Sequence, residues 1–310
     1  VPEHFQTKYK LLSQTKKLAG LSQDALRRVE KPDLNYSYGW SHGKEKFNGN
    51  PDVMKGSYYA DLPVYSGANS SIEGEQSEHN VWPKEIPELE TDFLALGNQV
   101  REVSMMLQDC IDSHIKSLIP SYSICFKDLM KISPNSKGRL LHYFPRGDMK
   151  ITPDDKWNGW HNDHGALTGL VSALYFDQQG EIMNEKIRLE KTGLWIQARN
   201  GEFHKVTYGK NDIAYQIGET FQILSGGVLH ATPHSVTIED DIPKDVHRST
   251  FALFMAPEKN YLMTLPQGAK KEDIVTSDIY PVPKIQDRFV KNEMTVGEFD
   301  ERTMNAFNVD

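Results

Sequence analysis

The segment WHNDHG, residues 160–165, places two histidines and one aspartate within four consecutive positions. In an extended strand alternate side chains point to the same side, so His161 and Asp163 would share one face and His164 would point to the other. An imidazole and a carboxylate on one face can supply two ligands to a metal ion inside a barrel. A pair of this kind also occurs by chance in many chains, so a metal site needs a third ligand from elsewhere.

Four histidines downstream could supply that ligand: His204, His230, His234 and His247. The stretch ILSGGVLHATPHSV contains His230 and His234, which a regular strand would turn to the same side, so alternation does not choose between them. The residue after Pro233 is a plausible strand start, which favours His234. Two histidines and one carboxylate leave the other face of a metal open, as in non-haem Fe(II) oxygenases, although zinc and manganese also fit.

The segment HRSTFALFM adds a possible anion site to this pattern. Arg248 and Thr250 are two residues apart, so a strand would present both on one face. A guanidinium beside a hydroxyl can bind a carboxylate, and an arginine that faces a barrel interior needs such a partner. The alternative is an arginine at the barrel rim that pairs with an acid such as Asp240.

The elements that would hold these residues begin with helical and loop patterns. Apolar residues recur every three or four positions over 91–118, which predicts a long amphipathic helix ended by Pro120. LSQDALRRVE predicts a shorter helix with Ser22 as its N-cap. The residues before that helix predict a short strand or loop, 34–65 predict a structured loop, and 66–80 predict an exposed, mobile excursion.

From residue 138 the pattern changes to at least seven short β-rich runs, punctuated by Gly, Asn and Asp and without a helical segment between them. This predicts a mainly β protein with a helical N-terminal part and a sandwich or jelly-roll core. We expect one domain over 1–310, with capping loops and helices in 1–135, the core in 136–267 and a C-terminal extension in 268–310 that contains a helix near 298–307.

Composition narrows the class of protein. The net charge of −8 argues against a nucleic-acid-binding protein, and no run of 18 apolar residues predicts a membrane span. The two cysteines, Cys110 and Cys125, are expected to be free thiols in a reducing compartment, which favours the cytoplasm. The chain starts at Val1, so the sequence does not exclude an organelle-targeting segment. Composition does not indicate an oligomeric state.

Four segments in order, RLLHYFP, WHNDHGALTGL, QIGETFQILSGGVLHATPHSV and RSTFALFM, resemble the isopenicillin N synthase-like branch of the Fe(II)/2-oxoglutarate-dependent dioxygenases, of the plant and algal type. The resemblance implies a double-stranded β-helix (jelly roll) with a long supporting helix. It also implies Fe(II) bound by His161, Asp163 and His234, and 2-oxoglutarate bound by Arg248 and Thr250. O2 would be the second co-substrate, with ascorbate as a possible reductant.

The chain departs from the family pattern where members often have Asn-Tyr-Tyr-Pro. Here the residues are His142, Tyr143, Phe144 and Pro145. Phe144 lacks the hydroxyl that would bind the co-substrate. His142 occupies the asparagine position and is therefore expected to contact 2-oxoglutarate or the substrate.

The resemblance implies a small-molecule substrate, which residues of the N-terminal loops and the barrel mouth would contact. The candidates are Tyr36, Tyr38, Tyr58, Arg139, Arg146, Trp157 and Trp195, of which Tyr58, Arg146 and Trp195 are the residues that we predict to bind it.

Algal kainoid synthases, which cyclise an N-prenylated glutamate oxidatively, are one possibility, and Lys150 and Lys191 would then add positive charge. Two other functions remain open. One is an oxidase of the isopenicillin N synthase type, in which Arg248 binds a substrate carboxylate and 2-oxoglutarate is not used. The other is a non-catalytic metal-binding barrel.

Overall fold

The computed structural model describes residues 2–44, 46–47, 50–63, 77–131, 136–152 and 155–307. Most of the excursion predicted at 66–80 lies outside these residues. No helix in the described part of the chain is long and apolar enough to cross a membrane.

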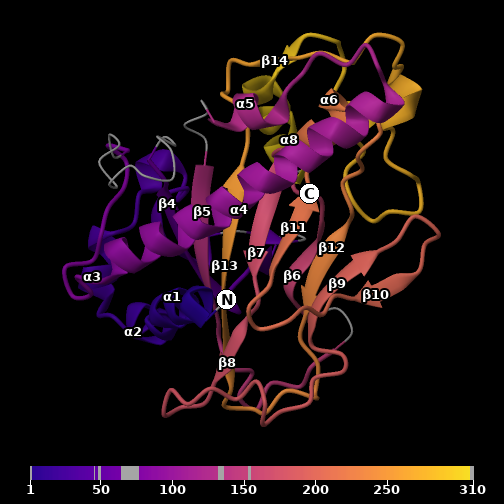
Figure 1. Ribbon diagram of the computed structural model, residues 1–310. Helices are drawn as coiled ribbons and strands as arrows, with labels where there is room; N and C mark the ends of the chain where they lie inside the picture. The colour runs from indigo at the N-terminus through magenta and orange to yellow at the C-terminus, as the bar shows by residue number, and fades with distance from the viewer. Residues whose placement is uncertain are drawn as a thin grey trace.

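Two antiparallel sheets form the core of the molecule (Figure 1). The large sheet has the order β1-β4-β5-β13-β7-β11, and β8 also pairs with β13. Its strands are β1 (Gly39–His42), β4 (Lys55–Asp61), β5 (Ser136–Tyr143), β7 (Leu167–Val171), β8 (Leu174–Phe176), β11 (Ile213–Ile217) and β13 (His247–Met255).

The small sheet has the order β10-β9-β12-β6. Its strands are β6 (Lys156–His161), β9 (Gly193–Gln197), β10 (Phe203–Lys205) and β12 (His234–Thr237). Two short pairs lie apart from both sheets: β2 (Lys46–Phe47) with β3 (Asn50–Pro51), and β14 (Leu262–Met263) with β15 (Met294–Thr295). Two facing antiparallel sheets behind a helical N-terminal part agree with the predicted jelly-roll core.

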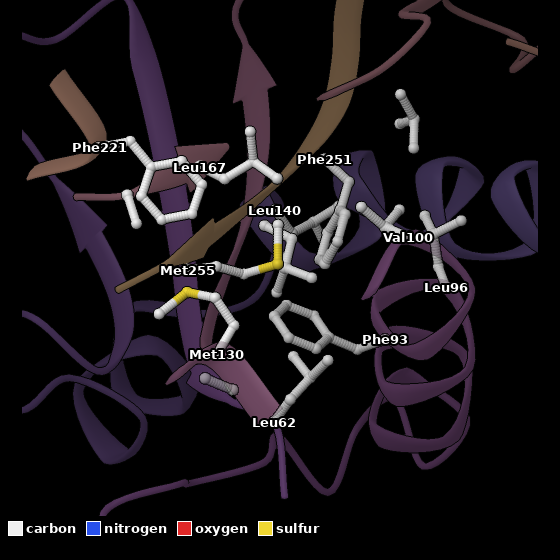
Figure 2. Close-up of a cluster of buried hydrophobic side chains, with 14 of the residues drawn as sticks. Leu62, Phe93, Leu96, Val100, Met130, Leu140, Leu167, Phe221, Phe251 and Met255 are labelled. Carbon is white, nitrogen blue, oxygen red and sulfur yellow. The ribbon is translucent and has the colours of Figure 1, made fainter. Parts of the chain in front are cut away.

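The helices are α1 (Pro2–Ser13), α2 (Thr15–Ala19), α3 (Gln23–Arg28), α4 (Leu89–Leu118), α5 (Phe126–Lys131), α6 (Glu219–Leu224), α7 (Ile285–Arg288) and α8 (Val296–Phe307), with 3-10 turns η1 (Pro32–Leu34) and η2 (Lys271–Ile274). Helix α4 runs across the outer face of the large sheet (Figure 1). Figure 2 shows Phe93, Leu96 and Val100 of α4 against Leu140 and Phe251 of the sheet. Burial of this apolar stripe stabilises the helix against the sheet.

Three predictions of local structure are confirmed. The helix expected at 91–118 is α4, which ends at Leu118, two residues before Pro120. The helix expected in LSQDALRRVE is α3, where the Ser22 hydroxyl accepts a hydrogen bond from the backbone N–H of Ala25. The C-terminal helix expected at 298–307 is α8.

Three other predictions are wrong. The N-terminal residues form α1 rather than a strand or loop, and Lys8, Leu11 and Leu12, spaced for one helical face, are fully buried. The loop expected at 34–65 contains β1 and β4, because β4 pairs with β5 along its whole length. The β-rich stretch after β11 contains α6, whose residues are all buried, so tertiary packing overrides the local strand propensity.

The large sheet separates two hydrophobic clusters. Leu140, Phe251 and Leu253 belong to the outer cluster under α4, whereas Leu141 and Tyr143 belong to the inner cluster between the two sheets. The inner cluster contains Leu141, Tyr143, Trp157, Val236, Ile238, Ile242, Val246 and Ala252. Side-chain alternation along β5 and β13 therefore decides which residues face the barrel interior.

Candidate metal centre

His161, Asp163 and His234 come together at one end of the small sheet. One ligand atom from each lies within 4.8 Å of the others. Asp163 Oδ1 lies 3.8 Å from Nε2 of His161 and 3.8 Å from Nε2 of His234. Asp163 and His234 are buried, and the His161 side chain is 24% exposed. These distances are close enough for all three groups to bind one ion after small side-chain movements.

The strands explain how residues so far apart in sequence meet. His161 is the last residue of β6 and His234 is the first of β12, and the two are directly paired. Asp163 lies two residues past the end of β6, in a loop. The side chains on either side of Asp163 point elsewhere, as alternation predicts, because Asn162 contacts Glu219 and His164 contacts Asp300.

Backbone carbonyls orient both imidazoles. His161 Nδ1 lies 2.8 Å from the Gly159 carbonyl, and His234 Nδ1 lies 3.2 Å from the Thr232 carbonyl. Because a carbonyl only accepts, each Nδ1 carries the proton and each Nε2 keeps its lone pair for an ion.

The charge states also suit a divalent cation. Loss of hydration, with the neighbouring His234 adding to the effect, lowers the pKa of His161 to about 3, so its imidazole is neutral at pH 7. Burial alone would raise the pKa of Asp163, but the two histidines hold it below its ordinary value. Asp163 Oδ2 is buried without a hydrogen-bond partner among the described residues. The neutral imidazole of His161 and an incompletely satisfied carboxylate, with His234 beside them, fit Fe(II) with an open face.

Arg248 lies on the inner face of β13 and is 7% exposed. Its guanidinium stacks 4.5 Å from the ring of Tyr143, and the side chains of Tyr175 and Tyr208 are also close. Its Nε and Nη1 have no hydrogen-bond partner within the described ranges. A buried cation with two unused donors is a site for an anion, because an uncompensated charge inside a protein is costly.

Thr250 shares the inner face with Arg248 and donates a hydrogen bond of 3.0 Å to the Val171 carbonyl. The alternative partner for Arg248 does not apply, because Asp240 instead lies 3.7 Å from Arg146. The tyrosines around Arg248 were not among the predicted site residues. Tyr143 could have been found by alternation, since it lies two residues from Leu141 on the same inner face.

Two predicted residues lie on the outer face of the large sheet. His142 is one position out of phase with Tyr143, lies 3.3 Å from the Thr15 hydroxyl and packs on the ring of His247. Tyr58 is fully buried under α4 and donates a hydrogen bond to the Val81 carbonyl. Alternation turns both side chains away from the barrel interior, so the structure does not bring either of them to the metal ligands or to Arg248.

Two further predicted residues lie away from the metal ligands. Arg146 follows the end of β5 that pairs with Arg248, and its Nε donates to the Ile242 carbonyl at 3.0 Å. Trp195 pairs with Ser235 and donates from Nε1 to the Lys191 carbonyl at 2.7 Å, whereas its neighbour Ile196 pairs with His234. Neither position suits substrate recognition at the metal.

Among the seven substrate candidates, Arg139 has the best position. It lies on β5 opposite Tyr59 of β4 and Ala252 of β13, on the inner face. Its Nε and Nη2 lie 3.0 and 2.8 Å from the Ser57 hydroxyl, and its guanidinium stacks 5.1 Å from the ring of Tyr59.

The register puts Arg139 at the height of the metal ligands. Thr168, whose side chain lies close to the Asp163 carboxylate, pairs with Phe254, and the next inward residue of β13, Ala252, pairs with Arg139. Arg248 lies four residues further along β13, about 13 Å at strand rise. The barrel interior therefore holds one cation beside the metal ligands and a second one deeper.

The descriptions of several solved structures with a similar fold name an oxygenase, iron or 2-oxoglutarate. One is a 2OG-Fe(II) oxygenase family protein of Caulobacter crescentus, with 20% identity, coverage of 96% of this chain and 84% of that one, and a TM-score of 0.65. A second is Neurospora crassa T7H in complex with α-ketoglutarate, with 16% identity, coverage of 99% and 83%, and a TM-score of 0.63. A third is JOX2 in complex with 2OG, Fe and JA, with 15% identity, coverage of 99% and 75%, and a TM-score of 0.59.

No family model matches the sequence, and no curated protein matches it either. The identities to the solved structures are low, so the likeness shows the fold. This chain shares the fold of these three solved structures.

Proposed function

We propose that this chain is a non-haem Fe(II)/2-oxoglutarate-dependent dioxygenase that oxidises a small, carboxylate-bearing metabolite. The observation that carries the proposal is the joint presence, in one barrel, of the His161, Asp163 and His234 cluster and the buried guanidinium of Arg248 with unused donors. The fold shared with proteins solved in complex with 2-oxoglutarate supports it.

Each residue has a defined task in this reaction. His161 and His234 would bind iron through Nε2, and Asp163 through its carboxylate. The guanidinium of Arg248 would bind the distal carboxylate of 2-oxoglutarate, with the Thr250 hydroxyl beside it. Iron bound there would supply, with 2-oxoglutarate and O2, the oxidising power for removal of a hydrogen atom from the substrate. The sheets around the inner cluster keep bulk water away.

We assign recognition of the substrate carboxylate to Arg139 in place of Arg146. The Ser57 hydroxyl and the Tyr59 ring hold its guanidinium on the inner face at the height of the metal ligands. An acid bound there would lie beside the open side of the metal. An N-prenylated glutamate that is cyclised to a kainoid, and a substrate that is hydroxylated, both meet this requirement, and either suits an enzyme of secondary metabolism in the isopenicillin N synthase-like branch.

The co-substrate is tested by anaerobic titration. Fe(II) and 2-oxoglutarate together should produce a visible metal-to-ligand charge-transfer absorption band, and aerobic turnover with substrate should produce succinate. An oxidase of the isopenicillin N synthase type would consume O2 with its substrate and form no succinate. Absence of both the band and succinate would exclude the proposed use of 2-oxoglutarate.

The substrate class is tested by screening acidic metabolites, N-prenylated glutamate included, for stimulation of succinate formation. Each acid is paired with its methyl ester, which keeps the shape and removes the charge. We expect the acid alone to stimulate turnover, and Arg139→Gln to raise its KM by about 30-fold or more, since loss of one partner of a buried charge pair costs about 2–5 kcal/mol. Lys150→Gln removes an exposed charge as the control. Esters that work equally well would refute the assignment.

A further inference from the structure

A buried ion pair joins the C-terminal segment to the helix behind the metal ligands. Glu219, the first residue of α6, is 1% exposed, and Arg288, the last residue of α7, is 4% exposed. Their side chains form a two-pronged contact, with Arg288 Nη1 2.7 Å from Glu219 Oε2 and Nη2 2.6 Å from Oε1.

The guanidinium of Arg288 is held from every side. Its remaining hydrogen bonds go to the Thr303 hydroxyl at 2.8 Å, the Pro283 carbonyl at 2.8 Å and the Lys284 carbonyl at 3.2 Å. Five hydrogen bonds use all five donors of the group. Arg288 therefore has one allowed geometry, and it fixes the carboxylate of Glu219 in turn.

Glu219 connects Arg288 to the metal-ligand segment by two hydrogen bonds. Its Oε1 accepts a 3.1 Å hydrogen bond from Asn162, which stands between His161 and Asp163 in the sequence. Its backbone N–H donates to the carbonyl of Asp163 at 2.8 Å. Gly218 permits this approach, because a Cβ there would lie 2.1 Å from the Gly165 carbonyl.

Asp163 needs such support because it lies beyond β6, where the strand ladder no longer holds the backbone. We propose that Glu219 and Arg288 are positioning residues, which hold the loop from Asn162 to Asp163 so that the aspartate carboxylate faces the two histidines. The proposal rests on the metal centre of the proposed function. It assigns to the C-terminal segment a part in metal binding, through contacts outside the barrel.

The test uses Mn(II) as a probe, with its dissociation constant and the melting temperature measured on the same purified proteins. In the double variant Glu219→Met and Arg288→Met both charges are replaced by apolar side chains, a change that often leaves stability intact. We expect the variant to fold and its dissociation constant for Mn(II) to rise about 10- to 100-fold, the usual effect of losing groups that orient metal ligands. Arg288→Lys, which keeps the charge and loses the fork, should show a smaller rise.

Asp300→Asn is the matched control, because it removes the charge from a second contact between the C-terminal segment and the residues around Asp163, the 3.6 Å pair of Asp300 with His164, and leaves Glu219 untouched. A purely structural role would lower the melting temperature and leave the affinity unchanged. Equal Mn(II) affinity in the folded double variant and wild type would overturn the inference alone. If the double variant does not fold, Arg288→Lys decides by the same comparison. A wild-type protein that binds no metal would overturn the proposed function as well.

Discussion

Replacing Arg248 with methionine should change stability and ligand binding in opposite directions. The side chain is 7% exposed, and its Nε and Nη1 lack partners in the described structure. Without a bound anion, this buried charge destabilises the folded state. Methionine fills a similar volume without charge, so the ligand-free protein should not lose stability.

The magnitudes follow from the contacts of Arg248. Replacing buried charges with apolar groups is often neutral or stabilises a protein by about 1–4 kcal/mol. The stacking on Tyr143 and the contact with Tyr175 are lost, which puts the net gain at about 1 kcal/mol, a rise of about 2–4 °C in melting temperature. For the bound acid, removal of a buried charged partner costs about 2–5 kcal/mol, which weakens 2-oxoglutarate binding about 30- to 4,000-fold.

The assay is thermal unfolding of the ligand-free protein, followed by anaerobic calorimetric titration with 2-oxoglutarate in the presence of Mn(II). Thr250→Val is the control, because it removes one hydroxyl and no charge, and should weaken binding by about tenfold or less. A variant Arg248→Met that unfolds at a much lower temperature yet binds 2-oxoglutarate as wild type does would show that Arg248 is structural. That result would refute the reasoning.

Three further predictions concern the metal and the pH. Asp163→Ala should lower Fe(II) affinity at least 100-fold while His164→Gln leaves it nearly unchanged; equal affinities in Asp163→Ala and wild type would support a non-catalytic barrel. Adding Fe(II) at about 100 times its dissociation constant should stabilise the fold by about 2.7 kcal/mol in thermal unfolding, a gain that a chelator reverses and that Asp163→Ala lacks. Burial lowers the pKa of His142 to about 3 and that of His247 to about 4, below the ordinary 6.5, so the unfolded chain binds protons that the folded chain does not. The free energy of unfolding should therefore be highest above pH 7 and fall as the pH drops from about 6.5 to 4, and His142→Gln should make this fall shallower by about 1.4 kcal/mol per pH unit. The same pH dependence of the free energy of unfolding in His142→Gln and wild type between pH 7 and 5 would contradict this.

The alternation of side chains explains which predicted site residues the structure brings together and which it does not. His161 and Asp163 follow it well enough to meet, even though the strand ends between them. His142 was placed by its position in a motif, and one residue of offset puts it outside the barrel beside Thr15. In a strand a shift by one residue moves a side chain to the opposite face. A residue assigned from its position in a motif, without knowledge of the strand register, can therefore be placed on the wrong face of the sheet.

The sequence alone determined what depends on short-range order. The spacing of apolar residues predicts α4, and Ser22 predicts the start of α3. The pairs His161 with Asp163 and Arg248 with Thr250, each two residues apart, predict two metal ligands and a carboxylate site. These features can be predicted from the sequence because helix periodicity, capping and the pairing of ligand residues depend on residues close together in the chain.

Tertiary structure alone decided which distant residues complete the site. Tyr175 joins Arg248 because β8 pairs with β13, Arg139 reaches the height of the metal ligands because β5 pairs with β13 in one register, and Glu219 reaches Asp163 because α6 packs behind the loop. Strand register and helix docking are set by the burial of the two hydrophobic clusters as wholes. No local pattern encodes them, since the paired residues lie many positions apart in the chain.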